Sequence, residues 1–146
     1  MQTKTADAVE LPARLRLAIA RIARRLRQEA GDELTPSMMA ALATIETRGP
    51  LTPSELALFE RIQRPTATRV LRRLEDDGLI ERAADPSDGR SALVAVTKDG
   101  AALLKKLRSR KNAYLARRLR ELPDEDVETL DRATAVLERL LDEERR

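Results

Sequence analysis

The stretch from residue 63 to residue 97 restricts the fold more than any other part of this sequence. In its first half, apolar side chains recur at the three- and four-residue spacing of one helix face, and the opposite face is rich in arginine and threonine. Gly78 follows, and glycine is the residue that most easily adopts the left-handed conformation at a helix end. We therefore expect an amphipathic helix whose apolar positions are Ala67, Val70, Leu71 and Leu74.

Two candidate strands and a turn follow that helix. Residues 79–83 and 91–97 form the candidate strands, and residues 85–90 are dense in aspartate, proline, serine and glycine, which favour turns. Helix, strand, turn and strand, in that order, are the elements of a winged helix. An arginine at the tip of the hairpin, Arg90, is then placed to reach a minor groove beside the major groove that receives the helix.

Proline follows threonine at two earlier helix starts. At Thr35 and again at Thr52, the threonine suits the N-cap and the next proline suits the first helical position. Glu55 stands three residues after Thr52 and completes the pattern of a capping box. A short helix after Thr52, a turn at residues 60–62 and the arginine-bearing helix then give the order of a helix-turn-helix.

Long helices are expected on both sides of this unit. Residues 1–9 are polar and lack periodicity, so they are expected to be a disordered tail. Residues 10–34 and 98–146 carry apolar stripes that a winged domain of residues 35–97 cannot bury by itself. From these residues alone, the stripes fit a helical hairpin within one chain.

The sequence lacks the residues of several common active sites. It contains no histidine and no cysteine, so the usual ligands of zinc and haem, the Ser-His pair and any disulfide are missing. Glycine-rich phosphate motifs and carboxylates at catalytic spacing are also missing, so we expect neither an enzyme nor a cofactor or metal. Aromatic residues make up 1% of the chain, which argues against stacking on RNA bases. Because it has no apolar run of about 20 residues and no signal core, we expect no membrane span and a cytoplasmic location.

Three motifs together resemble the MarR-type family of winged helix-turn-helix transcriptional regulators. They are Glu55-Leu56-Ala57 at a helix start, R-L-E-D-D-G-L-I-E-R at residues 73–82, and D-P-S-D-G-R-S-A-L-V-A-V-T-K-D-G at residues 85–100. Val96 stands where the family usually has leucine, and Gln63 or Arg64 stands where it often has a serine cap. The resemblance implies a mainly α fold with a small β-hairpin wing, in which N- and C-terminal dimerisation helices flank the winged helix-turn-helix.

The resemblance also implies a function. It implies a transcriptional repressor that binds a pseudo-palindromic operator in double-stranded DNA as a homodimer, and a small phenolic or other anionic effector that releases the DNA. Tyr114 and the arginines of the first helix are the candidate contacts for that effector. The implied dimer interface positions are Leu11, Leu15, Ile19, Val127, Leu130, Leu137 and Leu141. The competing interpretation is a winged-helix module that binds another protein, which would have little reason to keep both an arginine-rich helix face and Arg90.

Different elements are expected to make different DNA contacts. Arginine forks and threonine hydroxyls suit base edges in the major groove, whereas phosphate contacts position a protein without reading sequence. The expected major-groove residues are Arg64, Pro65, Thr66, Thr68 and Arg69. The expected phosphate contacts are Ser54, Arg72 and Arg73. In the wing, the resemblance implies that Arg90 enters the minor groove and that Asp88 orients it through an ion pair.

Overall fold

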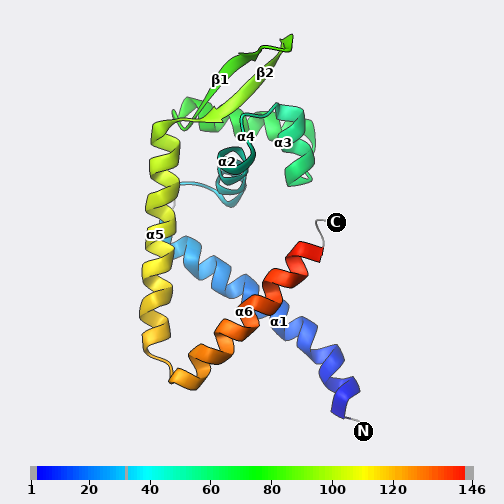
Figure 1. The fold of residues 1–146 in the computed structure, drawn as a ribbon, viewed down its shortest axis with the longest axis vertical. Coiled ribbons are helices and arrows are strands. Elements are labelled where there is room, and N and C mark those ends of the chain that lie inside the picture. The colour runs from blue at the N-terminus through cyan, green and yellow to red at the C-terminus, as the bar shows by residue number, and fades with distance from the viewer. Residues whose placement is uncertain (1–2, 32, 144–146) are drawn as a thin grey trace. The chain divides into compact units, whose positions relative to one another are not determined.

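The computed structural model describes residues 3–31 and 33–143, without the side chains of residues 3–8, 85, 88–91 and 143. The described elements, in chain order, are α1 (Thr3–Ala30), α2 (Pro36–Arg48), α3 (Pro53–Glu60), α4 (Arg64–Asp76), β1 (Ile80–Asp85), β2 (Asp88–Val96), α5 (Lys98–Arg120) and α6 (Asp124–Glu143) (Figure 1). This order confirms the predicted mainly α fold with a small β-hairpin. Among the described helices, none combines the length and the apolar character that a membrane crossing requires.

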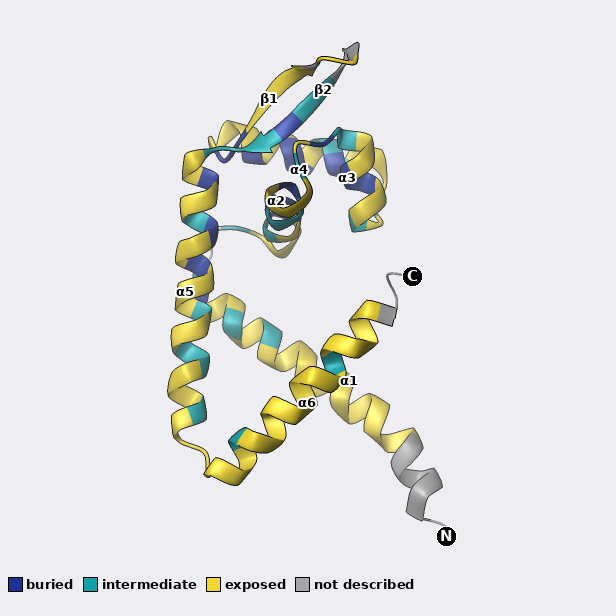
Figure 2. Cartoon of the chain, viewed as in Figure 1, coloured by how far each residue is buried: buried dark blue, intermediate teal, exposed yellow. Residues whose placement is uncertain are grey.

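The apolar core lies among α2, α3, α4, the hairpin and the N-terminal part of α5 (Figure 2). Leu42 of α2, Leu56 of α3 and Leu71 of α4 are fully buried in it. Val94 of β2 and Leu104 of α5 are equally buried, so both elements join the same core. Complete burial of one such aliphatic side chain contributes about 1.5–3 kcal/mol, so this core is the main force that positions α4.

Threonine caps begin α2 and α3, as the sequence predicts. Thr35 Oγ1 accepts a hydrogen bond from the Met38 N–H at 3.2 Å. Thr52 and Glu55 form both bonds of the capping box: Thr52 Oγ1 accepts from the Glu55 N–H at 3.2 Å, and a Glu55 carboxylate oxygen accepts from the Thr52 N–H at 3.4 Å. Because the first N–H groups of a helix have no partner inside it, such caps fix where each helix starts.

The hairpin of β1 and β2 is antiparallel and is attached to the core at its base. Ile80 pairs with Val96, and the register becomes irregular only near the turn. Leu51, which precedes α3, exchanges two backbone hydrogen bonds with Val94, with N···O distances of 3.1 and 2.8 Å. This bridge holds the middle of β2 beside the start of α3.

Thr97 and two glycines join α4, the hairpin and α5. Gly78 follows α4 with a φ of 73°, the left-handed conformation that the sequence predicts. The Thr97 hydroxyl donates to the Gly78 carbonyl at 2.7 Å and accepts from the Gly100 N–H at 3.1 Å, so it caps α5. A Cβ on Gly100 would lie 2.2 Å from the Leu79 carbonyl oxygen, so only glycine lets α5 start this close to β1.

The N-terminal helix is longer than the sequence predicts. α1 begins at Thr3, so the expectation of a disordered tail over residues 1–9 is wrong from residue 3 onwards. Pro12 lies inside α1. The tail prediction relied on apolar periodicity alone, and it underestimated the helix propensity of the alanine and glutamate residues that precede the stripe.

The chain divides into two compact units, Met1–Lys111 and Asn112–Arg146. Their boundary lies inside α5, whereas the predicted functional division separates residues 35–97 from residues 10–34 and 98–146. In the first unit, Ala30 of α1 and Leu107 of α5 are also buried. The assignment of these regions to dimerisation and to DNA binding stays a prediction.

Candidate nucleic-acid interface

α3 and α4 form the predicted helix-turn-helix, and a single left-handed residue makes the turn. Arg61 has a φ of 53°, and its N–H donates to the Leu58 carbonyl at 3.3 Å. The Ile62 N–H then donates to the Ala57 carbonyl at 3.0 Å. The turn lies where the sequence predicts it. The left-handed conformation of Arg61 could not be predicted, because only glycine and asparagine are usual signals for it.

The outward face of α4 carries three arginines that have no partner among the described residues. The opposite face is buried through the four apolar positions that the sequence predicts. Arg64, Arg69 and Arg72 are exposed, and none of them makes an ion pair or a side-chain hydrogen bond with any residue that the structure describes. An exposed, unpaired guanidinium can bind a phosphate or a base edge without first displacing a carboxylate.

Pro65, Thr66 and Thr68 complete the predicted major-groove set. Pro65 is exposed, whereas Thr66 and Thr68 are half-buried. Thr66 lines a small cavity of about 260 Å³ together with residues of α2, so part of its side chain faces the body of the protein. Gln63 occupies the N-cap position of α4 and forms no side-chain cap, so backbone N–H groups in the first turn of α4 remain available as donors.

The C-terminal end of α4 differs from its start because its charges are paired. Arg73 lies 3.6 Å from a carboxylate oxygen of Asp77, so a phosphate would compete with that carboxylate for it. Arg82 of β1 forms an ion pair with Glu75 at 2.5 Å, which ties the hairpin to α4. Arg82 ends one of the three sequence motifs, but nothing in the sequence predicts its ion pair with Glu75, because side-chain pairs between elements leave no periodic signal.

The remaining predicted contacts lie on α3 and on the hairpin. Ser54 is exposed in the first turn of α3, where the partial positive charge of a helix N-terminus favours a phosphate. The hairpin turn is shorter than the predicted residues 85–90, because the strands stay paired as far as Asp85 and Asp88. The side chains of Asp88 and Arg90 lie outside the described residues, so their ion pair and the minor-groove contact stay predictions.

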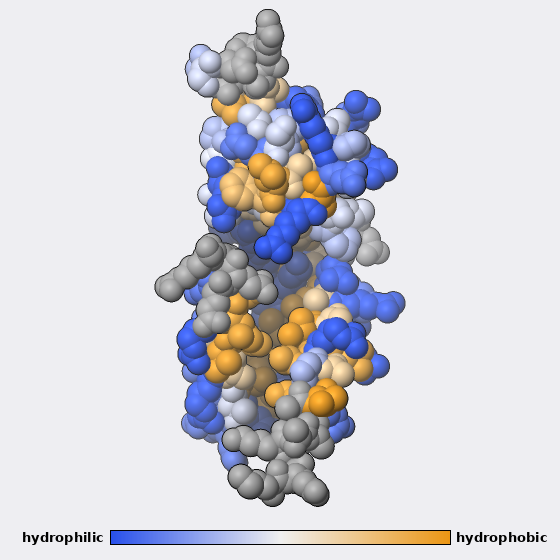
Figure 3. Space-filling model, turned by 90° about the vertical axis from the view of Figure 1, so that its right-hand side faces the viewer, coloured by the Kyte–Doolittle hydropathy of each residue, from blue (hydrophilic) through white to orange (hydrophobic). Residues whose placement is uncertain are grey.

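Apolar side chains are exposed on α1 and, separately, on α6. Figure 3 shows apolar side chains at the surface in orange. The most exposed of the predicted interface positions are Leu11 of α1 at 57% and Leu141 of α6 at 59%. Leu15, Ile19 and Leu130 are also exposed, and Val127 and Leu137 are half-buried. Large exposed apolar patches are unusual on soluble monomers and often mark surfaces that bind a partner.

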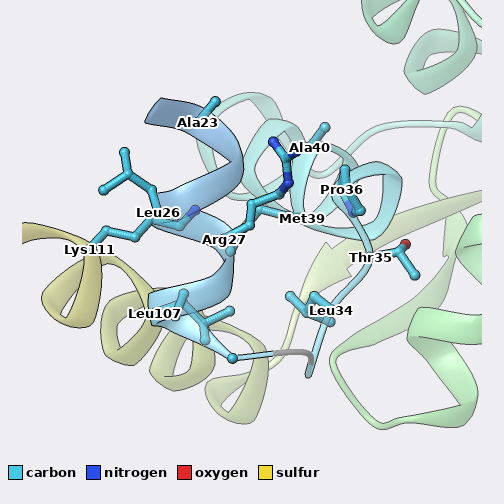
Figure 4. Close-up of a pocket in the computed structure, with 12 residues that line it drawn as sticks. Ala23, Leu26, Arg27, Leu34, Thr35, Pro36, Met39, Ala40, Leu107 and Lys111 are labelled. Carbon is cyan, nitrogen blue, oxygen red and sulfur yellow. The ribbon is translucent and has the colours of Figure 1, made fainter. Parts of the chain in front are cut away.

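A largely apolar cavity of about 280 Å³ lies between α1, the connection after it, α2 and α5 (Figure 4). Its aliphatic walls include Leu26, Leu34, Met39 and Leu107, and its cations are Arg27 of α1 and Lys111 of α5. Periodicity within one segment could not have found a site whose walls come from four segments.

Tyr114, the predicted ligand contact, is not among the residues that line this cavity. Its ring instead lies 5.6 Å from the guanidinium carbon of Arg117. Among the described residues there is also no group of three or more acidic side chains that could hold a metal ion.

Comparisons with known proteins agree with this arrangement. The model of the family described as "MarR family" matches residues 34–92. An HTH-type transcriptional regulator of Mycobacterium tuberculosis is 38% identical over 130 residues, which are 88% of this chain and 91% of that protein. The multiple antibiotic resistance protein MarR of Salmonella typhimurium is 34% identical over 100 residues, which are 68% and 69% of the two chains. A crystal structure of a Pseudomonas aeruginosa protein described as a transcriptional regulator has 33% identity and a TM-score of 0.85, and the match covers 92% of this chain and 96% of that one.

Proposed function

The chain belongs to the MarR family of DNA-binding transcriptional regulators, which are not enzymes, and from this premise we propose how it acts. We propose that it is a cytoplasmic repressor, that it binds a pseudo-palindromic operator as a homodimer, and that a small anionic ligand releases it. A bound dimer would repress by occupying promoter DNA that RNA polymerase needs.

The outward face of α4 is the observation that carries this proposal. Arg64, Arg69 and Arg72 are exposed and lack a carboxylate partner among the described residues, and the start of α4 lacks a side-chain cap. The winged domain of residues 35–97 is not basic as a whole, so its affinity for DNA must come from the positions of these arginine side chains. In the proposed complex, Arg64, Thr68 and Arg69 read bases with Pro65 and Thr66 beside them. Ser54, Arg72 and Arg73 hold phosphates, and Arg90 with Asp88 serves the minor groove.

The exposed apolar faces of α1 and α6 support the homodimer. A second copy of the chain would supply a face of the same composition, and a two-fold interface is self-complementary by construction. In such a dimer, the two α4 helices would enter successive major grooves about 34 Å apart. A pseudo-palindromic operator follows from that symmetry.

The cavity beside α1, α2 and α5 supports release by a ligand. Its apolar walls suit an aromatic or aliphatic body, and Arg27 and Lys111 suit an acidic group. Because α2 packs against α4 in the same core, a ligand that favours one arrangement of α1, α2 and α5 can shift the position of α4.

The experiment that tests the proposal is a gel-shift assay of the purified protein on its own upstream intergenic DNA. The assay uses a salt series and unrelated competitor DNA, and it compares wild type, the Arg69→Ala/Arg72→Ala double variant and a Lys105→Ala control. Lys105 is an exposed cation of α5 outside the proposed interface. We expect a discrete shift that survives competitor, a steep decline with salt, loss of the shift in the double variant and a normal shift in the control.

Two outcomes would contradict parts of this proposal. Absence of binding to any DNA at low salt would remove the repressor function and favour a module that binds another protein. Equal binding by wild type and the double variant would leave DNA binding intact but would show that α4 does not carry it.

A further inference from the structure

The connection between α1 and α2 forms one wall of the cavity. Gly31, Leu34 and Thr35 of this connection line the cavity, but they belong to no helix or strand. The Gly31 N–H closes the end of α1, and Thr35 caps α2. The polar contacts that the middle of the connection makes with α5 therefore decide how firmly this wall is closed.

Two cations of α5 make those contacts. Arg110 Nη1 donates to the Ala30 carbonyl at 2.8 Å and to a carboxylate oxygen of Glu33 at 3.3 Å. Lys106 Nζ lies 3.3 Å from the same Glu33 oxygen. A Cβ built on Gly31 would lie 3.4 Å from Arg110 Nη1, so this guanidinium stands directly behind the cavity wall.

Glu33 is the carboxylate that neutralises this part of α5. On α5, Arg110 and Lys111 lie four and five residues after Lys106, and Lys111 itself lines the cavity. Among the described residues, Glu33 is the only acidic side chain that pairs with any of the three. The hydrogen bond from Lys106 is the largest cause that lowers the pKa of Glu33, so this carboxylate is ionised at neutral pH.

We propose that Glu33 is a built-in competitor for the acidic group of a cavity ligand. The carboxylate reduces the positive potential that Lys106, Arg110 and Lys111 create at the cavity, so it lowers the affinity for anions in the empty protein. An anionic ligand takes over part of that charge, weakens the ion pairs of Glu33 and loosens the wall made by the α1–α2 connection. This inference rests on the ligand-binding part of the proposed function. It adds which ligand charge the site prefers and which segment moves when the ligand binds.

The test measures binding of two probes by isothermal titration calorimetry. The probes are 2-naphthoate, an apolar body with a carboxylate, and 2-naphthamide, which has nearly the same shape and no charge. Glu33→Gln should tighten naphthoate binding by about threefold to tenfold, because one negative charge near the ligand is removed in a partly exposed site. The same variant should leave naphthamide binding within about twofold, and the naphthoate difference should shrink in high salt.

Two further variants make the test specific. Glu46→Gln removes another carboxylate that pairs with α5, through Arg108 at 2.7 Å. Arg110, a partner of Glu33, also bonds the Ala30 carbonyl in the cavity wall, whereas Arg108 bonds no described lining residue, so Glu46→Gln should change naphthoate binding by less than about twofold. Lys106→Gln removes a positive charge and should weaken naphthoate binding. These side chains are all half-exposed or exposed, so the variants should fold, and a cooperative thermal transition checks this.

The outcomes separate this inference from the function on which it rests. Equal effects of Glu33→Gln and Glu46→Gln on naphthoate, or equal tightening of naphthoate and naphthamide, would overturn the role of Glu33 while ligand binding stands. If neither probe binds wild type or Glu33→Gln, both the inference and the ligand-release proposal fail, and the gel-shift result still decides DNA binding.

Discussion

Replacement of Arg69 by alanine should remove sequence reading at one base pair of each half-site without destabilising the fold. The Arg69 side chain is exposed and contacts no described residue through an ion pair or hydrogen bond, so the free energy of unfolding should change by less than about 0.5 kcal/mol. A bidentate arginine–guanine contact discriminates against the wrong base by about 1–3 kcal/mol. A homodimer carries two copies, so the loss per dimer should be about 2–6 kcal/mol.

The assay is fluorescence anisotropy with the operator and with a set of operators in which each base pair is changed in turn. Wild type should lose affinity at the position that Arg69 reads, and Arg69→Ala should bind the original and the changed operators equally at that position. Arg72→Ala is the matched comparison, because it removes the same charge from the same helix. It should weaken binding to every operator alike and lower the salt slope by about 0.9 for each phosphate that the variant no longer neutralises.

The refuting result is a profile of base preferences that is the same in Arg69→Ala and wild type. In that case Arg69 does not read a base, whatever the loss of affinity. If instead Arg72→Ala alters the preference at one position, the two arginines have exchanged the roles proposed for them.

Three further predictions concern stability. Thr52→Ala should lower the free energy of unfolding by about 1 kcal/mol in urea titrations, because it removes the capping box of α3, and an unchanged midpoint would mean that the cap adds nothing. Gln63→Ser should raise it by about 0.5–1 kcal/mol, since Gln63 already has N-cap geometry, with φ −74° and ψ 150°, and lacks only the side-chain acceptor; a lower midpoint would contradict this. The pKa of Glu33 is lowered from 4.5, chiefly by the hydrogen bond from Lys106, so its contribution to stability should be present above pH 4.5 and lost as the pH falls through the lowered value. Melting temperatures of wild type and Glu33→Gln should therefore converge in acid, and a constant difference between them would exclude this linkage.

Local chemistry explains why so much of the winged part could be predicted from the sequence. The capping box at Thr52, the left-handed Gly78 and the apolar face of α4 each depend on residues within a few positions of one another, and the structure has all three. The start of α1 was predicted too late in the sequence, because the prediction followed the amphipathic stripe. Such a stripe marks the part of a helix that packs, and the helix itself can extend beyond it.

Most of the proposed ligand site could not be predicted because its parts are distant in sequence. Glu33 meets Lys106 and Arg110 only after α5 has packed along the end of α1, and nothing near Glu33 in the sequence marks that contact. Tyr114 was chosen for its chemistry alone, without knowledge of which side chains share a cavity. The side chains of Asp88 and Arg90 at the wing tip lie outside the described residues, so their roles stay predictions.

The backbone bridge between Leu51 and Val94 also bears on how the protein behaves in concentrated solution. β2 is the more aliphatic strand of the hairpin, and an open edge on such a strand can recruit strands from other molecules and start aggregation. Leu51 occupies the outer backbone groups of Val94, and β1 covers the other side. The outer edge of β1 carries the charged Glu81 and Arg82, which make it a poor template for intermolecular sheets. The single bridge at Val94 thus protects part of the outer edge of the more aliphatic strand from pairing with other molecules.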